Sequence, residues 1–246
     1  MIVGLFTGAS SMVSQGDYQA VIARNLANVN TAGYKKNVAV FQSYISSTTN
    51  QNQDQSSTAT STGSSLGTIA TDFSQGMLEY TGNDLDISIK GEGFFTVKAN
   101  DGSVLYTRKG QFMLSRDMKL VTPEGWYLLG TTGEMQLTQN TKNIAIKGNG
   151  SIVADGKEIG NVRIVNVSKL STLESVGGCA YKLSDNAQPP EDTTDFEIAN
   201  HYLEKSNVNA VDEMVNMIAN MRGFQVGHKV TDSIDETLKK LIQLAT

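Results

Sequence analysis

Few residues in the chain have types and spacing that could do chemistry. Asp84 and Asp86 are two positions apart in a segment with strand periodicity, which would place both carboxylates on one face. Such a pair could serve acid–base catalysis. The solvent face of an alternating strand produces the same spacing, so we expect both carboxylates to be solvated. A hydrolase that uses them with His201 is the weakest hypothesis, because no further group converges on them.

The remaining candidates for metal binding or nucleophilic catalysis are also isolated. His201 and His228 stand near neither Cys179 nor another set of ligands, which disfavours a histidine triad or a metal site. A single cysteine excludes an internal disulfide and a CxxC motif. The glycines of the GEGFF run at 91–95 lack the third glycine and the following helix of a phosphate loop, so they predict a turn. We expect no metal, no cofactor and no enzyme activity.

Composition narrows the partners further. The chain has 246 residues and a formal net charge of −5, so it lacks the basic surface that binds nucleic acid. No run of apolar residues is long enough to span a membrane, and the apolar start of the chain lacks the basic leader of a cleaved signal peptide. Aromatic residues make up 7% and glycine is frequent, which favours a turn-rich β body with attached helices and no small-molecule substrate.

Both ends of the chain show helical periodicity. The segment 1–30 carries a stripe of mostly small residues at steps of four and three, which would let a partner helix approach closely. The segment 201–246 carries a stripe of branched apolar residues at the same steps. We expect the two helices to pair as a coiled-coil-like stalk. The predicted contact residues are Leu5, Ala9, Met12, Ala20, Ala23, Leu26 and Ala27 in the first segment, and Val208, Val211, Val215, Ile218, Val226, Val230, Ile234, Leu238 and Leu241 in the second.

The middle of the chain divides into two parts. Residues 31–72 are expected to be an extended linker region, and its 46–65 stretch is rich in Ser, Thr, Asn and Gln, which favours a mobile loop. Residues 73–200 alternate with a period of two and contain glycine turns such as the Asn-Asp-Gly run at 100–102, which predicts a central antiparallel β domain. The fold class is therefore α+β.

Asparagines concentrate where the predicted helices meet the rest of the chain. Asn25 and Asn28 lie at the end of the first helix, and Asn207 and Asn209 lie at the start of the second. An asparagine side chain can cap a helix or bond across a pair of helices. Local capping and contact with another subunit are both open on sequence alone.

Four segments resemble the bacterial flagellar rod and hook proteins. They are ARNLANVNTAGYK at 23–35, GEGFF at 91–95 with YTRKGQF at 106–112, LEKSNVN at 203–209, and MVNMI at 214–218. They occur in the order of that family and extend over nearly the whole chain. Several such matches together are far more specific than any one of them.

The resemblance implies an axial structural subunit of the flagellar basal body, stacked helically into the shaft that carries torque from motor to hook. It implies terminal helices packed into an inner tube, contacts with other copies and with other rod and hook axial proteins, and a periplasmic location. It also implies delivery by the flagellar type III export apparatus, which explains the lack of a signal peptide. The chain is too short for the extra outer domain of most hook proteins.

Two questions stay open at this point. The glycine and glutamine at Gly223 and Gln225 depart from the ending common in the distal rod type, which slightly favours the proximal type with a β domain. The alternative function is a β-rich surface binding module whose terminal helices only oligomerise it. That module would keep its ligand-binding activity after removal of the ends, whereas a rod subunit would polymerise.

Overall fold

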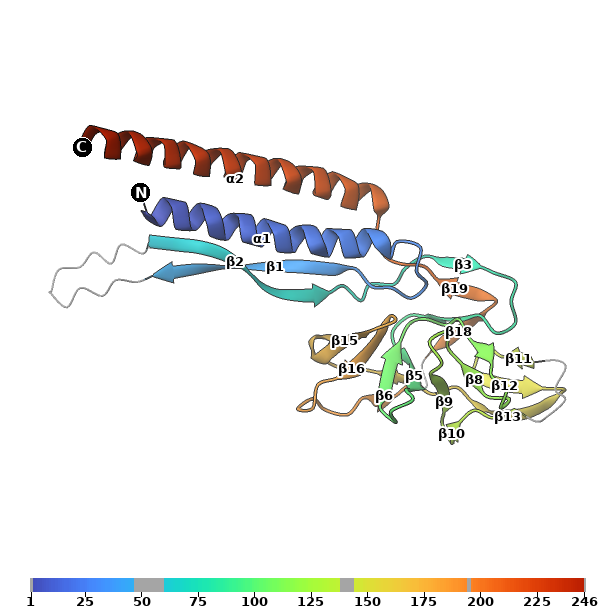
Figure 1. Ribbon diagram of the computed structural model, residues 1–246. Coiled ribbons are helices and arrows are strands. Elements are labelled where there is room, and N and C mark those ends of the chain that lie inside the picture. The colour runs from blue at the N-terminus through green and yellow to red at the C-terminus, as the bar shows by residue number, and fades with distance from the viewer. Residues whose placement is uncertain (1, 47–59, 138–143, 194–195, 246) are drawn as a thin grey trace. The chain divides into compact units, whose positions relative to one another are not determined.

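The computed structural model describes residues 2–46, 60–137, 144–193 and 196–245 (Figure 1). The chain divides into two compact units. Unit 1 contains residues 1–27, 37–72 and 209–246, and unit 2 contains residues 28–36 and 73–208. Helices at both ends with antiparallel sheets between them confirm the predicted α+β class.

Unit 1 is built from two long helices and a hairpin. The helices are α1 (Ile2–Ala27) and α2 (Ala210–Ala245), and the strands are β1 (Asn37–Ser46) and β2 (Thr60–Thr71). Helix α1 lies between α2 on one side and the β1–β2 hairpin on the other (Figure 1). The predicted pairing of the terminal helices is therefore confirmed.

Local sequence explains where α2 begins and how closely it approaches α1. The Asn209 side chain accepts a hydrogen bond from the backbone N–H of Val211 at 3.0 Å, which caps the helix. Two acidic residues in the first turn suit the positive end of the helix dipole. Gly8 and Gly227 lie in the seam. A Cβ at Gly8 would lie 3.0 Å from Thr231 Oγ1, and one at Gly227 would lie 3.4 Å from Met12 Cγ, so both glycines let the backbones come near.

The structure differs from the expected linker over residues 31–72. Ser46 and residues 60–65, placed in a mobile loop by their composition, belong to β1 and β2, and residues 47–59 lie outside the described residues. The hairpin is antiparallel, with register shifts at Val40/Phe41 and Tyr44/Ile45. The Ser- and Thr-rich β2 forms a strand because it pairs its backbone with β1. On β1, the ring of Phe41 packs edge-on against Tyr18 of α1, with ring centroids 5.6 Å apart.

Unit 2 is an antiparallel β body. Its largest sheet follows the order β15-β16-β6-β5-β9-β8-β7, with β10 on β9, β14 on β5 and β17 on β14. Smaller sheets pair β11-β12-β13, β18-β4 and β19-β3. The strands are β3 (Leu78–Tyr80), β4 (Ile87–Lys90), β5 (Phe94–Lys98), β6 (Val104–Thr107), β7 (Met113–Leu114), β8 (Leu120–Val121), β9 (Tyr127–Gly130), β10 (Gly133–Glu134), β11 (Ile144–Ile146), β12 (Ser151–Ala154), β13 (Lys157–Asn161), β14 (Ile164–Asn166), β15 (Leu173–Gly177), β16 (Ala180–Leu183), β17 (Glu191–Asp192), β18 (Glu197–Asn200) and β19 (Tyr202–Glu204), with a 3₁₀ turn at Leu170–Thr172.

The two large apolar clusters of the described residues lie in unit 2. One cluster contains Ile87, Phe95, Leu120 and Leu128, and a second forms around Phe94 and Val165 with neighbouring aromatic rings. Each of these six side chains is at most 2% exposed. The body can therefore fold around its own interior, in contrast to the helix pair described next.

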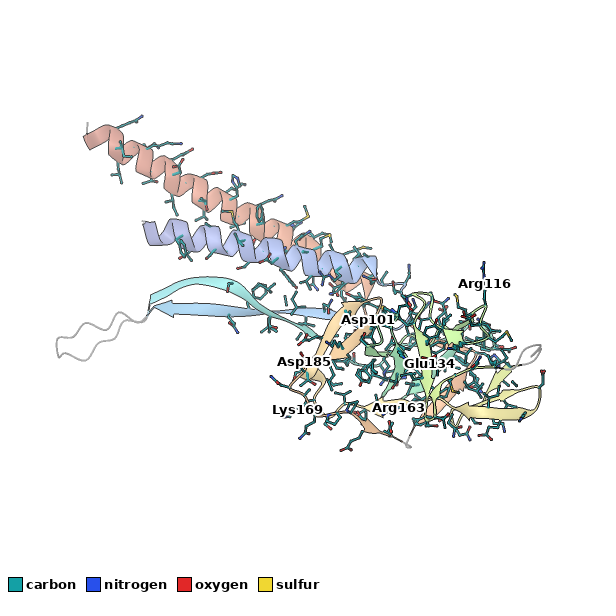
Figure 2. All side chains as sticks on the ribbon, turned by 60° about the horizontal axis from the view of Figure 1, so that its bottom comes forward. Asp101, Arg116, Glu134, Arg163, Lys169 and Asp185 are labelled. Atoms are coloured by element: carbon teal, nitrogen blue, oxygen red, sulfur yellow. The ribbon has the colours of Figure 1, made fainter. Side chains whose placement is uncertain are left out.

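Charged side chains lie around this body rather than in one patch. Figure 2 labels Asp101, Arg116, Glu134, Arg163, Lys169 and Asp185, all in unit 2. Glu134 accepts hydrogen bonds from Lys98 and Lys119 at 2.9 and 2.7 Å, and these two bonds lower the pKa of its carboxyl to about 2.

Candidate assembly surface of the helix pair

The alanines of the predicted α1 stripe are bare. Ala9, Ala20, Ala23 and Ala27 are exposed. The contacts with α2 come from Met12 of the stripe and from neighbouring positions, including Gly8, Gln15 and Gln19. The alanine positions thus form a bare surface of α1, available to a helix from elsewhere.

The apolar stripe of α2 is bare as well. Its members Val211, Val215, Ile218 and Val226, which we call the outer stripe, are each between 53% and 67% exposed. Val230 and Leu241 are also exposed, and Ile234 is half-buried. On α1, Met12 and Leu26 are half-buried. Leu5 and Leu238 lie within α1 and α2, and their side chains are outside the described part of the structure.

The seam between the helices is polar where a monomeric helix pair would be apolar. The amide of Asn220 donates to Gln15 O at 2.9 Å and to Gln19 Oε1 at 2.8 Å. Asn25 donates to the carboxylate of Glu213 at 3.3 Å, and both of these side chains are 1% exposed. These directional bonds fix the register of α1 on α2, while the outer stripe of α2 remains exposed.

Among the predicted asparagines, Asn25 is held by hydrogen bonds at both ends of its amide. Its Nδ2 donates to Asn37 O at 2.8 Å, and its Oδ1 accepts from Asn37 N at 2.9 Å. This pair of bonds mimics a strand ladder and joins the end of α1 to the start of β1. Of the two roles left open by the sequence, the structure shows an intramolecular one for Asn25.

Replacing Asn25 with aspartate should destabilise unit 1 by roughly 3 kcal/mol. The carboxylate would leave Asn37 O without its donor and would lie against the buried Glu213. Urea denaturation followed by circular dichroism at 222 nm measures the change. Asn30→Asp, at an exposed position just beyond the helix, is the control and should change stability little. Equal effects of the two variants would contradict the role of Asn25.

The other boundary residues also act within the chain. Asn207 accepts from Lys36 N at 2.7 Å and donates to Ser74 O at 3.2 Å. Asn28 accepts from the Thr31 hydroxyl at 3.2 Å in the turn after α1. Val208, predicted as a contact residue, is buried in unit 2. Asn209 is the helix cap described above. The predicted residues thus separate into internal clamps and bare helix faces.

A buried ion cluster in unit 2 was missed by reasoning from the sequence. Lys35 Nζ lies 2.6 Å from Glu204 Oε1 and also donates to Ser74 O at 2.7 Å. Glu204 Oε1 accepts from Gly76 N at 2.9 Å, and its Oε2 lies 3.5 Å from Arg108 Nη1. Lys35 and Glu204 are both 1% exposed. In the sequence, the only sign of this cluster is that Lys35, Arg108 and Glu204 each lie inside one of the motif segments.

Arg108 is the second cation of this cluster. Burial lowers the pKa of its guanidinium from the ordinary value, and the Glu204 carboxylate partly offsets this. The guanidinium also lies over the ring of Phe94, 5.3 Å from its centroid. Its role is structural, since the cluster presents two cations and a carboxylate to one another and not to solvent.

The candidate catalytic residues do not form a site. His201 Nδ1 lies 3.4 Å from Asp84 Oδ1 on the surface. Asp86, expected on a solvent face, is instead buried, with its carboxylate accepting from Asn83 Nδ2 at 3.2 Å. Asp86 is buried because it lies at the end of a turn, directly before Ile87 enters the core. Burial raises the pKa of the Cys179 thiol to about 11, which keeps it protonated and unreactive.

The described residues hold no group of three or more His, Cys, Asp and Glu side chains placed to bind a metal ion. None of the described helices is long and apolar enough to cross a membrane.

Three family models match the chain in order. The model described as flagella basal body rod protein matches residues 5–35. The flagellar hook protein FlgE/F/G D1 domain matches residues 88–154. The flagellar basal body rod FlgEFG protein C-terminal model matches residues 199–244. The first and third contain the terminal helices, and the second contains the centre of the β body.

Curated proteins similar to the chain extend over its whole length. It is 34% identical to the flagellar basal-body rod protein FlgG of Buchnera aphidicola from Schizaphis graminum, with 99% of this chain and 100% of that protein aligned. It is also 34% identical to FlgG of Bacillus subtilis strain 168, with 99% of each aligned. The flagellar basal-body rod protein FlgF of the same Buchnera is 27% identical, with 98% and 96% aligned.

Proposed function

The chain belongs to the flagellar basal-body rod protein family and is a non-enzymatic structural subunit, and from this premise we propose that the bare faces of its helix pair drive helical assembly into the torque-bearing shaft. Membership of the family implies assembly with rod and hook proteins. The partners we propose are further copies of this chain and the rod or hook proteins at its two ends.

The observation that carries this proposal is the exposed apolar stripe of the helix pair. The buried positions of α1 and α2 include the polar Ser14, Asn25 and Glu213 as well as Val21 and Ile22, each at most 4% exposed, whereas the outer stripe of valine and isoleucine side chains is bare. A helix pair adapted to a monomer buries its apolar stripe. A contiguous exposed stripe marks a protein contact. Contacts repeated along a screw axis cover such surfaces and produce an open filament.

Location follows from the same proposal. A rod subunit works in the periplasm, and we propose that the type III export apparatus delivers it there unfolded. An antiparallel body with a separate core supports this, since its local hairpins can reform after passage. Assignment to the proximal or the distal rod type stays a prediction.

A charge on the α1 stripe tests the proposal. Ala23→Glu places a carboxylate on the exposed face where a neighbouring helix would pack, so it should abolish incorporation into basal bodies and swimming. The measurement is motility in soft agar together with immunodetection of the chain in purified basal bodies, in the source bacterium with its own gene deleted.

The matched control is Ala23→Ser, which keeps a small uncharged side chain and should assemble normally. Circular dichroism of both purified variants should match the unmodified chain, because Ala23 is exposed and the β body lies in the other unit. Normal swimming and incorporation of the Ala23→Glu variant would overturn the assignment of this face.

A further inference from the structure

A cavity of about 290 Å³ lies in unit 2 between two loops that have no part in the proposed function. The first loop, residues 167–172, joins β14 to β15, and the second, residues 184–190, joins β16 to β17. We propose that this cavity binds a carboxylate of monosaccharide size, whose negative group is held by the Lys169 ammonium. The inference concerns unit 2 alone and does not depend on assembly through the helix pair.

Strand pairing builds the frame of the cavity. The two loops begin or end at β14 and β17, which pair with each other, and at β15 and β16, which also pair. Each loop is therefore anchored at both ends to strands that anchor the other. The backbone N–H of Ser184 in the second loop also donates to Thr172 O in the first at 2.9 Å. Val167, which lines the cavity, is 5% exposed and belongs to the apolar cluster around Phe94. The cavity is therefore formed before any ligand arrives.

The polar side chains of the lining are available to a ligand. Ser168, Lys169, Asn186 and Gln188 are exposed, and their side chains make no hydrogen bond or ion pair with other described residues. Water satisfies these groups in the free protein, and a ligand that reproduces the bonds can replace it. The Thr172 hydroxyl donates to Lys169 O at 2.7 Å and keeps its capacity to accept. Both loops contribute, so donors and acceptors surround the cavity.

The charge of the lining favours an anion. Lys169, labelled in Figure 2, is its one charged residue, and none of the described residues that line the cavity is acidic. Asp185, in the second loop but outside the lining, lies 3.8 Å from the Lys182 ammonium. Hydrogen bonds between a cation and a carboxylate are about twice as strong as bonds between neutral groups. One ammonium among neutral donors therefore suits a group with a single negative charge.

The volume and the remaining lining define the rest of the ligand. Ligand pockets in proteins start at about 300 Å³, so this cavity admits one sugar-sized molecule and not a longer chain. The amides of Asn186 and Gln188 can each donate and accept, as the hydroxyl groups of a sugar require. Val167, Ala187 and Pro189 supply an apolar side for the carbon atoms of a ring. A sugar acid meets all of these conditions.

Binding of D-glucuronate to the full-length chain tests the inference, with D-glucose as the matched neutral sugar. Glucuronate carries a carboxylate where glucose has a hydroxymethyl group, so the comparison isolates the charge. Two-dimensional NMR of the isotope-labelled chain should show saturable shifts of the Ser168, Lys169 and Gln188 backbone amides. Glucose should bind at least fivefold more weakly, and added salt should weaken the binding of glucuronate.

Two lysine variants locate the site. Lys169→Gln should weaken glucuronate binding at least fivefold, whereas Lys157→Gln, which removes an exposed lysine of β13, should leave it unchanged. Equal binding of the two sugars, equal binding by the two variants, or no saturable shift of the loop amides would overturn the inference. Both variants should assemble normally, because the proposed assembly surface belongs to unit 1. Failure of this inference is therefore distinct from failure of the proposed function, which Ala23→Glu tests.

Discussion

Replacing Glu204 with glutamine is expected to lower the thermal transition of unit 2 by roughly 10 °C. Breaking a buried ion pair by removing one partner destabilises a protein by about 3–5 kcal/mol. For a unit of this size, 1 kcal/mol corresponds to about 2–4 °C. Differential scanning calorimetry of the full chain measures the shift.

The size of the effect follows from what Glu204 holds. Its carboxylate contacts Lys35 and Arg108 and accepts the backbone N–H of Gly76. Neutralising it would remove the carboxylate that pairs with both cations, in a site where Lys35 is 1% exposed. The amide could still accept one hydrogen bond, but it could not compensate the charge of Lys35.

Two further variants separate charge from shape. Lys35→Met combined with Glu204→Gln removes the uncompensated lysine and should recover part of the loss. Glu197→Gln breaks the exposed pair with Lys90, whose side chains are 48% and 66% exposed, and should shift the transition by only a degree or two. A Glu204→Gln shift as small as that of Glu197→Gln would show that the cluster does not stabilise the unit.

Gly33→Ala is expected to destabilise unit 2 by roughly 3 kcal/mol. Gly33 has φ +70°, and an added Cβ would lie 2.4 Å from Lys109 N and 2.8 Å from Arg108 C. These are backbone atoms and cannot rotate aside. The same residue donates its N–H to Glu204 O at 2.7 Å, so displacement of the turn would also disturb the ion cluster. Chemical denaturation measured by intrinsic fluorescence would report the loss.

Gly102→Ala is the matched control for the turn. Gly102 also has a positive φ, +87°, but a Cβ there would meet nothing within 4 Å. Gly102→Ala should lower the stability of unit 2 by about 1 kcal/mol, because only the positive φ is unfavourable for alanine there. If the two alanine variants proved equally stable, the close approach at Gly33 would not be the cause.

These residues give the motif segments a physical meaning. Gly33 and Lys35 in the first motif, Arg108 in the second and Glu204 in the third converge on one buried cluster of unit 2. The motif therefore fixes the internal fold of the subunit around its chain crossings. We propose that contact between subunits falls on the helix stripes, where alanine and valine are exposed.

Periodicity was sufficient to predict the elements that depend on local pattern. Steps of three and four gave both helices, alternation gave strands such as β5 and β6, and Asn209 was among the predicted caps. The hairpin was missed because residues 60–65 carry almost no apolar signal. Its strands are stabilised by backbone pairing with each other and by α1, which composition does not reveal.

The amino-acid sequence by itself determined the α+β class, the paired terminal helices and the family, since each depends on local period or on motif order. Only the tertiary structure decided which helix face is inside. A helical period shows that residues share a face, but not what that face meets. Here Asn25, Asn220 and Glu213 form the polar interior of the helix pair, while Ala23 and Ile218 remain outside. Hydrogen bonds between residues about 200 positions apart fix which face of each helix is buried, and no local sequence pattern reveals such distant partners.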